Sequence, residues 1–264
     1  MVKAKLRVFA EVNVDWPWNT TFPAFIILLL FWCHPVLAIP VEELDPDREW
    51  RLKRLSFSGN ENFSSGELKG VLSTQERPWY APWRARPAFE PGTFSADLER
   101  LIRFYQSKGY YEAKVTYDLD VDREQNLVTP AIQISEGQPV RVTEIALKIV
   151  DFPELEPKLR ALLPKLPLAE GKVFSEEAYQ QTEAKFKEFF YDRSRARVEI
   201  QRRAEVILDQ HQVRVFYTLT AGPETSFGTT TVEGVKDVST NIVLRELTYK
   251  PGEPFSGKAV KNTE

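Results

Sequence analysis

The amino-acid sequence predicts an α+β protein made of repeated modules, in each of which two helices pack on one face of a three-stranded mixed sheet. Three observations support this prediction: helical and strand-like hydrophobic patterns alternate along the chain, a short signature recurs about every eighty residues, and similar hairpins follow it. The chain has 264 residues, of which 42% are hydrophobic and 28% are charged, so it can bury several small cores.

The recurring signature is a Phe-Ser pair that closely follows a Gly. PGTFS at 91–95 recurs as GKVFS at 171–175 and as GEPFS at 252–256, so the phenylalanines are 80 and 81 residues apart. A serine hydroxyl can accept a hydrogen bond from a free amide of the first helical turn, and a Phe before it can pack as a hydrophobic staple. We therefore expect helices to begin at Ser95, Ser175 and Ser256.

The first copy of the repeat has the most regular patterns. After Ser95, apolar residues recur at helical spacing up to Tyr105, and Gly109 is placed to end the helix. Between 112 and 121 apolar and polar residues alternate strictly, as in a half-buried strand, and a polar turn at 122–126 leads to a returning strand at 127–134. Ahead of these elements we expect a strand at 51–57 and a shorter helix at 64–72.

The same order of elements is expected in the other copies. The second copy predicts a strand at 142–150, helices at 154–163 and 175–190, and strands at 198–208 and 213–219. The third predicts a strand at 229–235 and a helix at 240–247, but only nine residues follow Phe255, so this copy is expected to be incomplete. The predicted domains are a linker at 39–49 and modules at 50–139, 140–223 and 224–264.

The amino terminus predicts a secretory signal peptide at residues 1–38. Three basic residues precede an apolar run at 22–33, and small residues lead to a cleavage site between Ala38 and Ile39. The run has only twelve residues, whereas a membrane-spanning helix needs roughly 20. Export with removal of the segment is therefore the first interpretation, and a retained membrane anchor is its alternative.

Charge and residue types argue against several classes of function. Without residues 1–38 the net charge is near minus four, which does not favour binding to nucleic acid. That part of the chain has no cysteine and one histidine, His211, so we expect no catalytic triad, no metal site and no cofactor. The adjacent acids Glu176 and Glu177 allow a carboxylate hydrolase as a remote alternative, but acids in a helix's first turn are usual.

The order strand, helix, helix, strand, strand, with FSGN at 57–60 and KGY at 108–110, resembles the POTRA domain. Tandem POTRA domains are found in outer-membrane assembly factors, and three in series resemble the translocation and assembly module that helps autotransporters insert. Against this pattern the second copy has DRSR at 192–195 in place of the Gly-Tyr turn, which predicts a different turn. Pro130 within a central strand predicts a bulge or a strand end.

The resemblance implies a non-catalytic scaffold on the periplasmic side of the outer membrane. It implies extended outer-membrane protein clients, an inner-membrane or periplasmic partner subunit, and attachment to the membrane through a β-barrel beyond residue 264. In POTRA domains the strand after the second helix lies at the sheet edge and can pair with a client strand. The edge residues expected to bind a partner are Lys114, Val115, Thr116, Tyr117, Val198, Glu199 and Ile200.

Two further stretches are candidates for binding. A Pro-rich insertion at 75–91 carries Trp79, Tyr80 and Trp83 beside arginines, the composition of a binding hot spot; alternatively, the rings fold onto their own domain. Five arginines between 192 and 203 could meet acidic partners or lipid headgroups, but a solvated edge strand is the simpler interpretation. A membrane-anchored envelope or division scaffold remains the alternative function, with the apolar leader retained.

Overall fold

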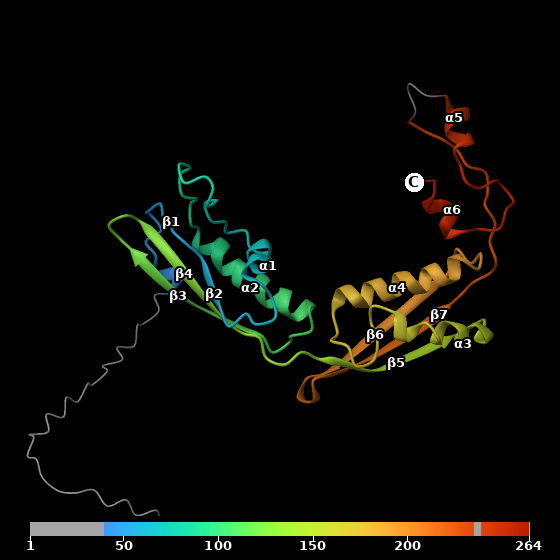
Figure 1. Ribbon diagram of the computed structural model, residues 1–264, viewed down its shortest axis with the longest axis horizontal. Helices are drawn as coiled ribbons and strands as arrows, with labels where there is room; N and C mark the ends of the chain where they lie inside the picture. Colours follow the sequence, from blue (N-terminus) through green and yellow to red (C-terminus); the bar gives the residue numbers. More distant parts are fainter. Residues whose placement is uncertain (1–39, 235–238, 264) are drawn as a thin grey trace, which may run out of the picture. The chain divides into compact units, whose positions relative to one another are not determined.

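The computed structural model of the chain describes residues 40–234 and 239–263 (Figure 1). The predicted signal peptide and the cleavage site at Ala38 and Ile39 lie outside the described residues. Within the described ranges, no helix combines the length and the apolar character needed to cross a membrane. The described residues contain two complete α+β modules and a shorter third segment, and each is considered in turn.

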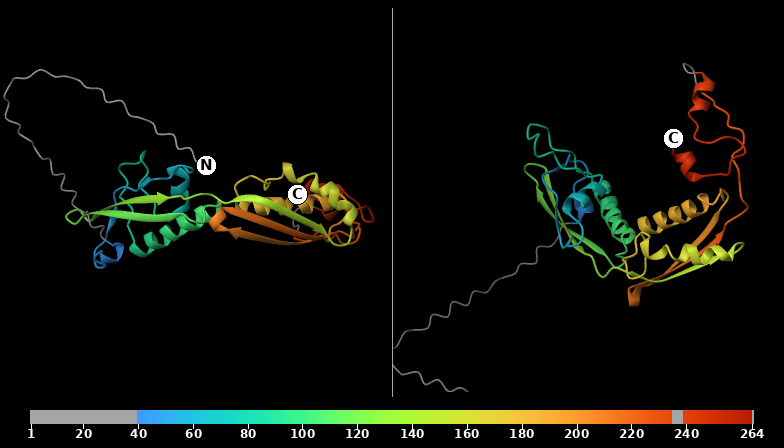
Figure 2. Two further views of the ribbon diagram at one scale, coloured as in Figure 1. Left: turned by 90° about the horizontal axis from the view of Figure 1, so that it is seen from below. Right: turned by 45° about the vertical axis from the view of Figure 1, so that its right-hand side comes forward.

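The first module is a mixed sheet with two helices on one face (Figures 1 and 2). Strand β4 is central: it pairs antiparallel with β3 on one side and parallel with β1 and then β2 on the other. A buried cluster that includes Leu52, Phe94, Leu101 and Ile132 fills the space between the sheet and the helices. The elements are β1 (Arg51–Leu52), β2 (Ser56–Ser58), α1 (Ser65–Val71), α2 (Pro91–Ser107), β3 (Lys114–Asp122) and β4 (Leu127–Ser135).

Pro130 lies in the middle of the central strand β4, where no strand end or bulge interrupts its pairing with β3. The position of its missing amide faces β1 and β2, not β3. Val128, two residues earlier, has its backbone groups on the same side of β4, and its carbonyl accepts from the Lys53 amide at 2.8 Å. At that point the predicted strand 51–57 is interrupted, and the Leu55 amide donates to the Glu76 carboxylate at 2.5 Å. The proline therefore divides the edge strand into β1 and β2.

The two helices of the first module begin by different means. Helix α1 has a capping box, in which the Ser64 hydroxyl accepts from the Glu67 amide and the Glu67 carboxylate accepts from the Ser64 amide. Helix α2 begins at Pro91, with Glu90 as the N-cap, so the expected start at Ser95 is wrong. Proline fits the first helical position because its φ is already helical and its missing amide would have no partner there.

The structure also corrects the register of the repeat. The residues just before the three helices of the repeat form the same backbone hydrogen bonds in all three copies. The amides of Phe89, Phe174 and Phe255 donate to the carbonyls of Trp50, Val140 and Thr225 at 2.8, 3.0 and 2.9 Å. Phe89, not Phe94, is thus the counterpart of Phe174 and Phe255. Phe94 instead packs inside α2 against Tyr117 in the core.

The FSGN motif owes its glycine to a close approach of two backbones. Gly59 has φ +74°, and a Cβ atom there would lie 2.1 Å from the carbonyl oxygen of Ile134. The following Asn60 side chain donates to the Phe63 carbonyl at 2.8 Å, which shapes the turn into α1. Only glycine accommodates both the left-handed backbone and the lack of space.

The second module repeats the arrangement around the central strand β7. This strand pairs parallel with β5 and antiparallel with β6, and α4 lies along one face of the sheet (Figure 1). The predicted helix at 154–163 is shorter than expected, because short 3-10 turns flank it on both sides. The elements are β5 (Arg141–Ile149), α3 (Glu156–Arg160), α4 (Glu176–Tyr191), β6 (Glu199–Ile207) and β7 (Gln212–Thr220).

The turns after the two long helices have the same hydrogen bonds despite their different sequences. After α2, the Tyr110 amide donates to the Tyr105 carbonyl at 2.9 Å, and Gly109 has φ +92°. After α4, the Arg195 amide donates to the Phe190 carbonyl at 3.0 Å, and Ser194 has φ +55°. The expectation of a different turn is therefore wrong: both helices end in a Schellman motif, with serine in the left-handed position of the second.

The third segment contains α5 (Thr240–Arg245) and α6 (Gly257–Lys261). The predicted cap at Ser256 is confirmed, because its hydroxyl accepts from the Ala259 amide at 3.3 Å. The prediction of a strand at 229–235 is wrong for residues 229–234, which form no strand. An isolated β-bridge joins the nearby Ser226 to Pro254. Among the described residues no strand lies beside 229–234, so the backbone has no ladder to join.

We predict that Ser194→Gly raises the free energy of unfolding of the second module by about 1 kcal/mol, because a left-handed backbone costs roughly that for a residue with a Cβ atom. Hydrogen exchange of the β7 amides measures the change, since β7 is central in this module. Ser194→Ala keeps the Cβ atom and is the matched control, expected to be close to neutral. A loss of protection in Ser194→Gly would show that the serine side chain has a stabilising role.

Candidate partner-binding edges and the aromatic loop

Strand β3 forms a free border of the first sheet, as expected for the strand after the second helix. On the neighbouring strand β4, the carbonyls of Asn126 and Val128 accept from the amides of β1 and its extension. The backbone groups of even-numbered β4 residues therefore face β1, and those of odd-numbered residues face β3. In the β3 register, Thr116 lies opposite Gln133, so its amide faces β4. The backbone groups that point to the free border belong to Val115, Tyr117, Leu119 and Val121.

Strand β6 forms the equivalent border of the second sheet. The Val150 amide donates to the Leu219 carbonyl at 2.9 Å, so the odd-numbered residues of β7 face β5 and the even-numbered ones face β6. Glu199 lies opposite Thr220 and therefore pairs with β7. The free backbone groups belong to Ile200, Arg202, Ala204 and Val206, and the same alternation assigns Val198 to this side.

The seven edge residues expected from the sequence thus divide into two groups. Val115, Tyr117, Val198 and Ile200 have backbone groups at the free borders, whereas Lys114, Thr116 and Glu199 use theirs within the sheets. No backbone hydrogen bond outside the sheets engages Val115, Tyr117 or Ile200 within the part of the chain that the structure describes. These borders can accept an added strand without breaking an existing pair.

The two faces of β3 differ in chemistry. The side chains of Val115, Tyr117 and Val121 are half-buried against the helices, and Leu119 is buried. The opposite face carries Thr116 and a series of acidic side chains that begins with Asp118, which accepts a hydrogen bond from the Gln133 side chain at 2.7 Å. A strand added at this border would have one apolar row and one polar row.

The aromatic loop, residues 75–89, extends away from α1 and α2 (Figure 1). The side chains of Trp79, Tyr80 and Trp83 are 90%, 62% and 79% exposed, so the alternative in which they fold onto their own domain is wrong. The loop is nevertheless ordered by its own contacts. Ala81 between the aromatic residues is buried, and the Arg77 guanidinium donates to the carbonyls of Pro82 and Arg84 at 2.8 and 3.2 Å.

Asp97 on α2 holds the start of the aromatic loop. Its buried carboxylate accepts from the amides of Ser73 and Thr74, both at 2.8 Å, and forms an ion pair with Arg100. Burial opposes ionisation, but the hydrogen bonds from Thr74 and Ser73 and the contact with Arg100 outweigh it and lower the pKa of Asp97. The sequence contained no signal for this role, because an acid within an amphipathic helix usually faces solvent.

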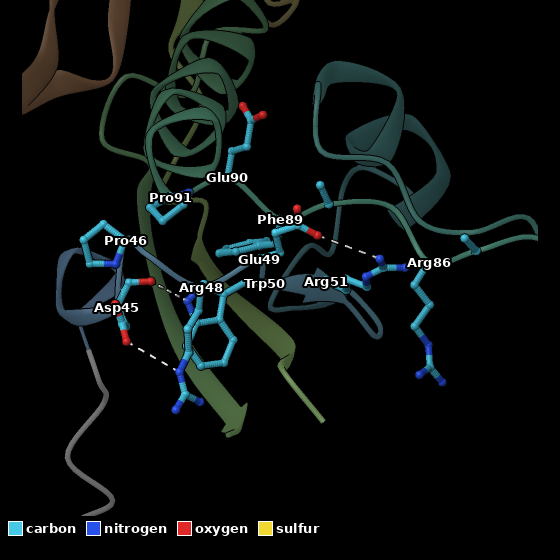
Figure 3. Close-up of a pocket in the computed structure, with 12 residues that line it drawn as sticks. Asp45, Pro46, Arg48, Glu49, Trp50, Arg51, Arg86, Phe89, Glu90 and Pro91 are labelled. Carbon is cyan, nitrogen blue, oxygen red and sulfur yellow. Dashed lines mark hydrogen bonds and ion pairs between the residues drawn. The ribbon is translucent and has the colours of Figure 1, made fainter. Parts of the chain in front are cut away.

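A shallow hollow of about 570 Å³ lies at the base of the aromatic loop (Figure 3). Trp50 and Phe89 form its floor, and the Trp50 indole donates to the Asp45 carbonyl at 3.0 Å. Its charges are partly paired with one another, Arg48 with Asp45 at 3.5 Å and Arg51 with Glu49 at 4.0 Å. The Arg86 side chain extends away from the hollow. The lining contains no nucleophile beside a base, so it does not suggest catalysis.

The arginines between 192 and 203 contact the second module itself. The guanidinium groups of Arg193 and Arg195 lie 3.6 Å from the ring centroids of Phe189 and Phe152. Arg202 pairs with Glu183 at 3.0 Å, and Arg203 lies over an aromatic ring at 4.6 Å. These contacts favour the interpretation of a charged edge over a site for acidic partners.

The acidic side chains have structural roles, and these include the pair that allowed a carboxylate hydrolase as an alternative. Glu176 and Glu177 lie in the first turn of α4, and Glu177 pairs with Lys108 at 3.1 Å. The buried Glu136 accepts from the Asn62 amide at 3.1 Å and from the Tyr105 hydroxyl at 3.0 Å. Residues 40–234 and 239–263 contain no group of three or more His, Cys, Asp or Glu side chains suited to a metal ion.

We predict that Asp97→Asn lowers the free energy of unfolding of the first module by about 1–3 kcal/mol at pH 7, because buried amides at 73 and 74 lose a charged acceptor. The lowered pKa of Asp97 means that the wild-type advantage is fully present above the ordinary pKa of an aspartate side chain and is lost as the pH falls through the lower folded-state pKa. Urea unfolding followed by tryptophan fluorescence, to which the buried Trp50 contributes, measures the free energy of unfolding at pH 7 and its change with pH.

The contrary outcome would be equal stability of the two chains at pH 7. Arg100→Gln is the companion variant: it removes the exposed partner and keeps both amide bonds, so it should cost less than Asp97→Asn.

Comparison with known proteins agrees with the fold. Residues 51–137 match the sequence model of the POTRA family, described as a surface antigen variable number repeat. A crystal structure of the POTRA3-5 region of BamA from Haemophilus influenzae has the same fold, with a TM-score of 0.53 and 18% identity. The similarity covers 82% of this chain and 84% of that one.

Two similar proteins are larger than this chain. A protein of Treponema pallidum named as an outer membrane protein assembly factor is 25% identical over 213 residues, which are 78% of this chain and 24% of its own length. The outer membrane protein assembly factor BamA of Nitratidesulfovibrio vulgaris is 21% identical over 218 residues, 80% of this chain and 27% of its own. This chain thus spans about a quarter of the length of these two relatives.

Proposed function

From the premise that residues 51–137 belong to the POTRA family, we propose that the chain is a periplasmic scaffold for assembly of outer-membrane proteins, which binds extended clients at its free sheet borders. The observation that carries this proposal is the pair of unpaired edge strands, β3 and β6, with free backbone groups at alternate residues. The names of the two similar proteins, both assembly factors for outer membrane proteins, support it.

Backbone pairing suits a scaffold that handles many clients. Hydrogen bonds to amides and carbonyls place little demand on the client's sequence, and the flanking side chains add preference. At β3, a client strand would meet a half-buried apolar row that includes Val115 and Tyr117, and a polar row that includes Thr116 and Asp118. Strands of outer-membrane barrels alternate apolar and polar residues with the same period of two.

We further propose the clients, the partner and the location that the family resemblance implies. The clients of the protein are outer-membrane proteins of autotransporter type, and a second subunit in the inner membrane or periplasm binds one of the two borders. The protein acts at the periplasmic side of the outer membrane after export. It performs no catalysis, because strand addition requires only free backbone groups.

We predict that Val115→Pro or Ile200→Pro weakens binding of an extended client about tenfold, because each proline blocks one border at a residue whose amide is free. Neither substitution removes a ladder hydrogen bond, so circular dichroism should show a folded chain. Fluorescence anisotropy of a labelled peptide with alternating apolar and polar residues measures the affinity.

Thr116→Pro and Gln201→Pro are the matched controls, one residue along the same strands. Their amides face β4 and β7, so these prolines should lower stability by about 1–3 kcal/mol, which the border prolines should not. If the double variant Val115→Pro/Ile200→Pro bound the peptide as tightly as the wild type, border pairing would not be the binding mode.

A further inference from the structure

The aromatic loop exposes three large rings within five residues. Trp79, Tyr80 and Trp83 are all more than half exposed, whereas the other large exposed hydrophobic residues, such as Val150 and Ile242, lie singly on other segments. Single exposed apolar residues are normal on soluble proteins, but a concentration of aromatic side chains marks a surface for binding.

The exposure results from the way the loop is built. Ala81 is 1% exposed and its amide donates to the Pro78 carbonyl at 3.0 Å, so the loop closes inward at this residue. The Arg84 amide in turn donates to the Ala81 carbonyl at 3.0 Å. Trp79 and Tyr80 precede the buried Ala81 in the chain and Trp83 follows it, and all three rings are exposed. Trp79 and Tyr80 also contact each other edge to face, with ring centroids 6.0 Å apart.

The rings are surrounded by positive charge. From Arg77 to Phe89 the chain has three arginines and no acidic residue, although the protein as a whole is acidic. Arg77 is used inside the loop, where its guanidinium donates to two carbonyls. Arg84 and Arg86 form no ion pair with a carboxylate among the described residues, so both guanidinium groups are available to an anionic partner.

Indole and phenol rings beside unpaired arginines match the chemistry of a lipid bilayer surface. Trp and Tyr concentrate at the level of the headgroups, where the ring is apolar and its N–H or O–H stays hydrated, and arginine is attracted to anionic headgroups. A protein interface of ordinary size needs roughly 20–30 residues on each side, far more than a loop tip supplies. Because each ring can enter a bilayer surface individually, a narrow tip is sufficient there.

We propose that the aromatic loop is a docking site for an anionic phospholipid surface. Trp79, Tyr80 and Trp83 enter the headgroup region, and Arg84 and Arg86 contact lipid phosphates. The contact would hold the first module beside a membrane while β3 and β6 remain free. It does not depend on the border-pairing function, since the loop and these strands are separate surfaces of the chain.

Sedimentation of the full chain with lipid vesicles tests the proposal. The wild-type chain should bind vesicles of phosphatidylcholine with phosphatidylglycerol more tightly than vesicles of phosphatidylcholine alone, and added salt should weaken that preference. Trp79→Ala/Trp83→Ala should lower binding to both kinds of vesicle about tenfold. Arg84→Gln/Arg86→Gln should lower binding about tenfold only where phosphatidylglycerol is present.

A matched control separates the loop from the rest of the surface. Leu208→Ala/Ile242→Ala removes two exposed apolar side chains elsewhere and should leave vesicle binding unchanged. Val115→Pro should also leave it unchanged, which distinguishes this site from the border-pairing function. All variants share residues 1–39, so a contribution of that segment to binding cancels in the comparison.

Fluorescence gives a second readout that does not depend on affinity. In a chain with Trp16, Trp18 and Trp32 replaced by Phe, emission comes from the buried Trp50 and from Trp79 and Trp83. Vesicles containing phosphatidylglycerol should shift this emission to shorter wavelength and protect it from acrylamide. Equal vesicle binding by the wild type and by Trp79→Ala/Trp83→Ala would overturn the proposal. So would the finding that this variant no longer binds a protein partner although it still binds vesicles normally.

Discussion

The central position of the last strand in each module is the constraint on which the rest of the structure depends. β4 lies between β3 and the edge formed by β1 and β2, and β7 lies between β6 and β5. The strand before each central strand, β3 or β6, therefore lies at a border of its sheet. Half of the backbone groups of β3 and β6 consequently point away from the sheet. Because these amides and carbonyls have no partner in the sheet, the topology leaves room for an added strand without a specialised side chain.

The chain protects these borders from indiscriminate association while leaving them accessible. β3 carries several acidic side chains on its open face, and β6 carries arginines that lie over aromatic rings or beside carboxylates of its own module. Charged side chains along an edge strand discourage pairing between copies of the same chain. Under the proposed function, the same charges would limit which extended segments fit beside the two strands.

Buried polar contacts determine the local departures from a regular module. Asp97 and Glu76 together hold the start of the aromatic loop, Asp97 through two backbone amides and Glu76 through the Leu55 amide and Lys69. Pro130 has no amide to donate to the edge strand, the pairing is interrupted at this point, and the Leu55 amide donates to Glu76 instead. The insertion is thus accommodated where the sheet is already interrupted, and its aromatic tip remains outside the core.

The sequence by itself determined the order of the elements in the first two modules, because hydrophobic periods of 3.6 and 2 and caps such as Ser64 and Ser175 act within a few residues. The repeat was therefore visible from residues alone, whereas the border position of the strand after the long helix was expected only from the family resemblance and is given by the sheet topology. Only the tertiary structure decided that Phe89 and not Phe94 matches Phe174, since that correspondence rests on hydrogen bonds to the first strand. The burial of Asp97, the exposure of Trp79 and the division of edge residues into free and paired were likewise undetermined, because each depends on which distant segment lies alongside.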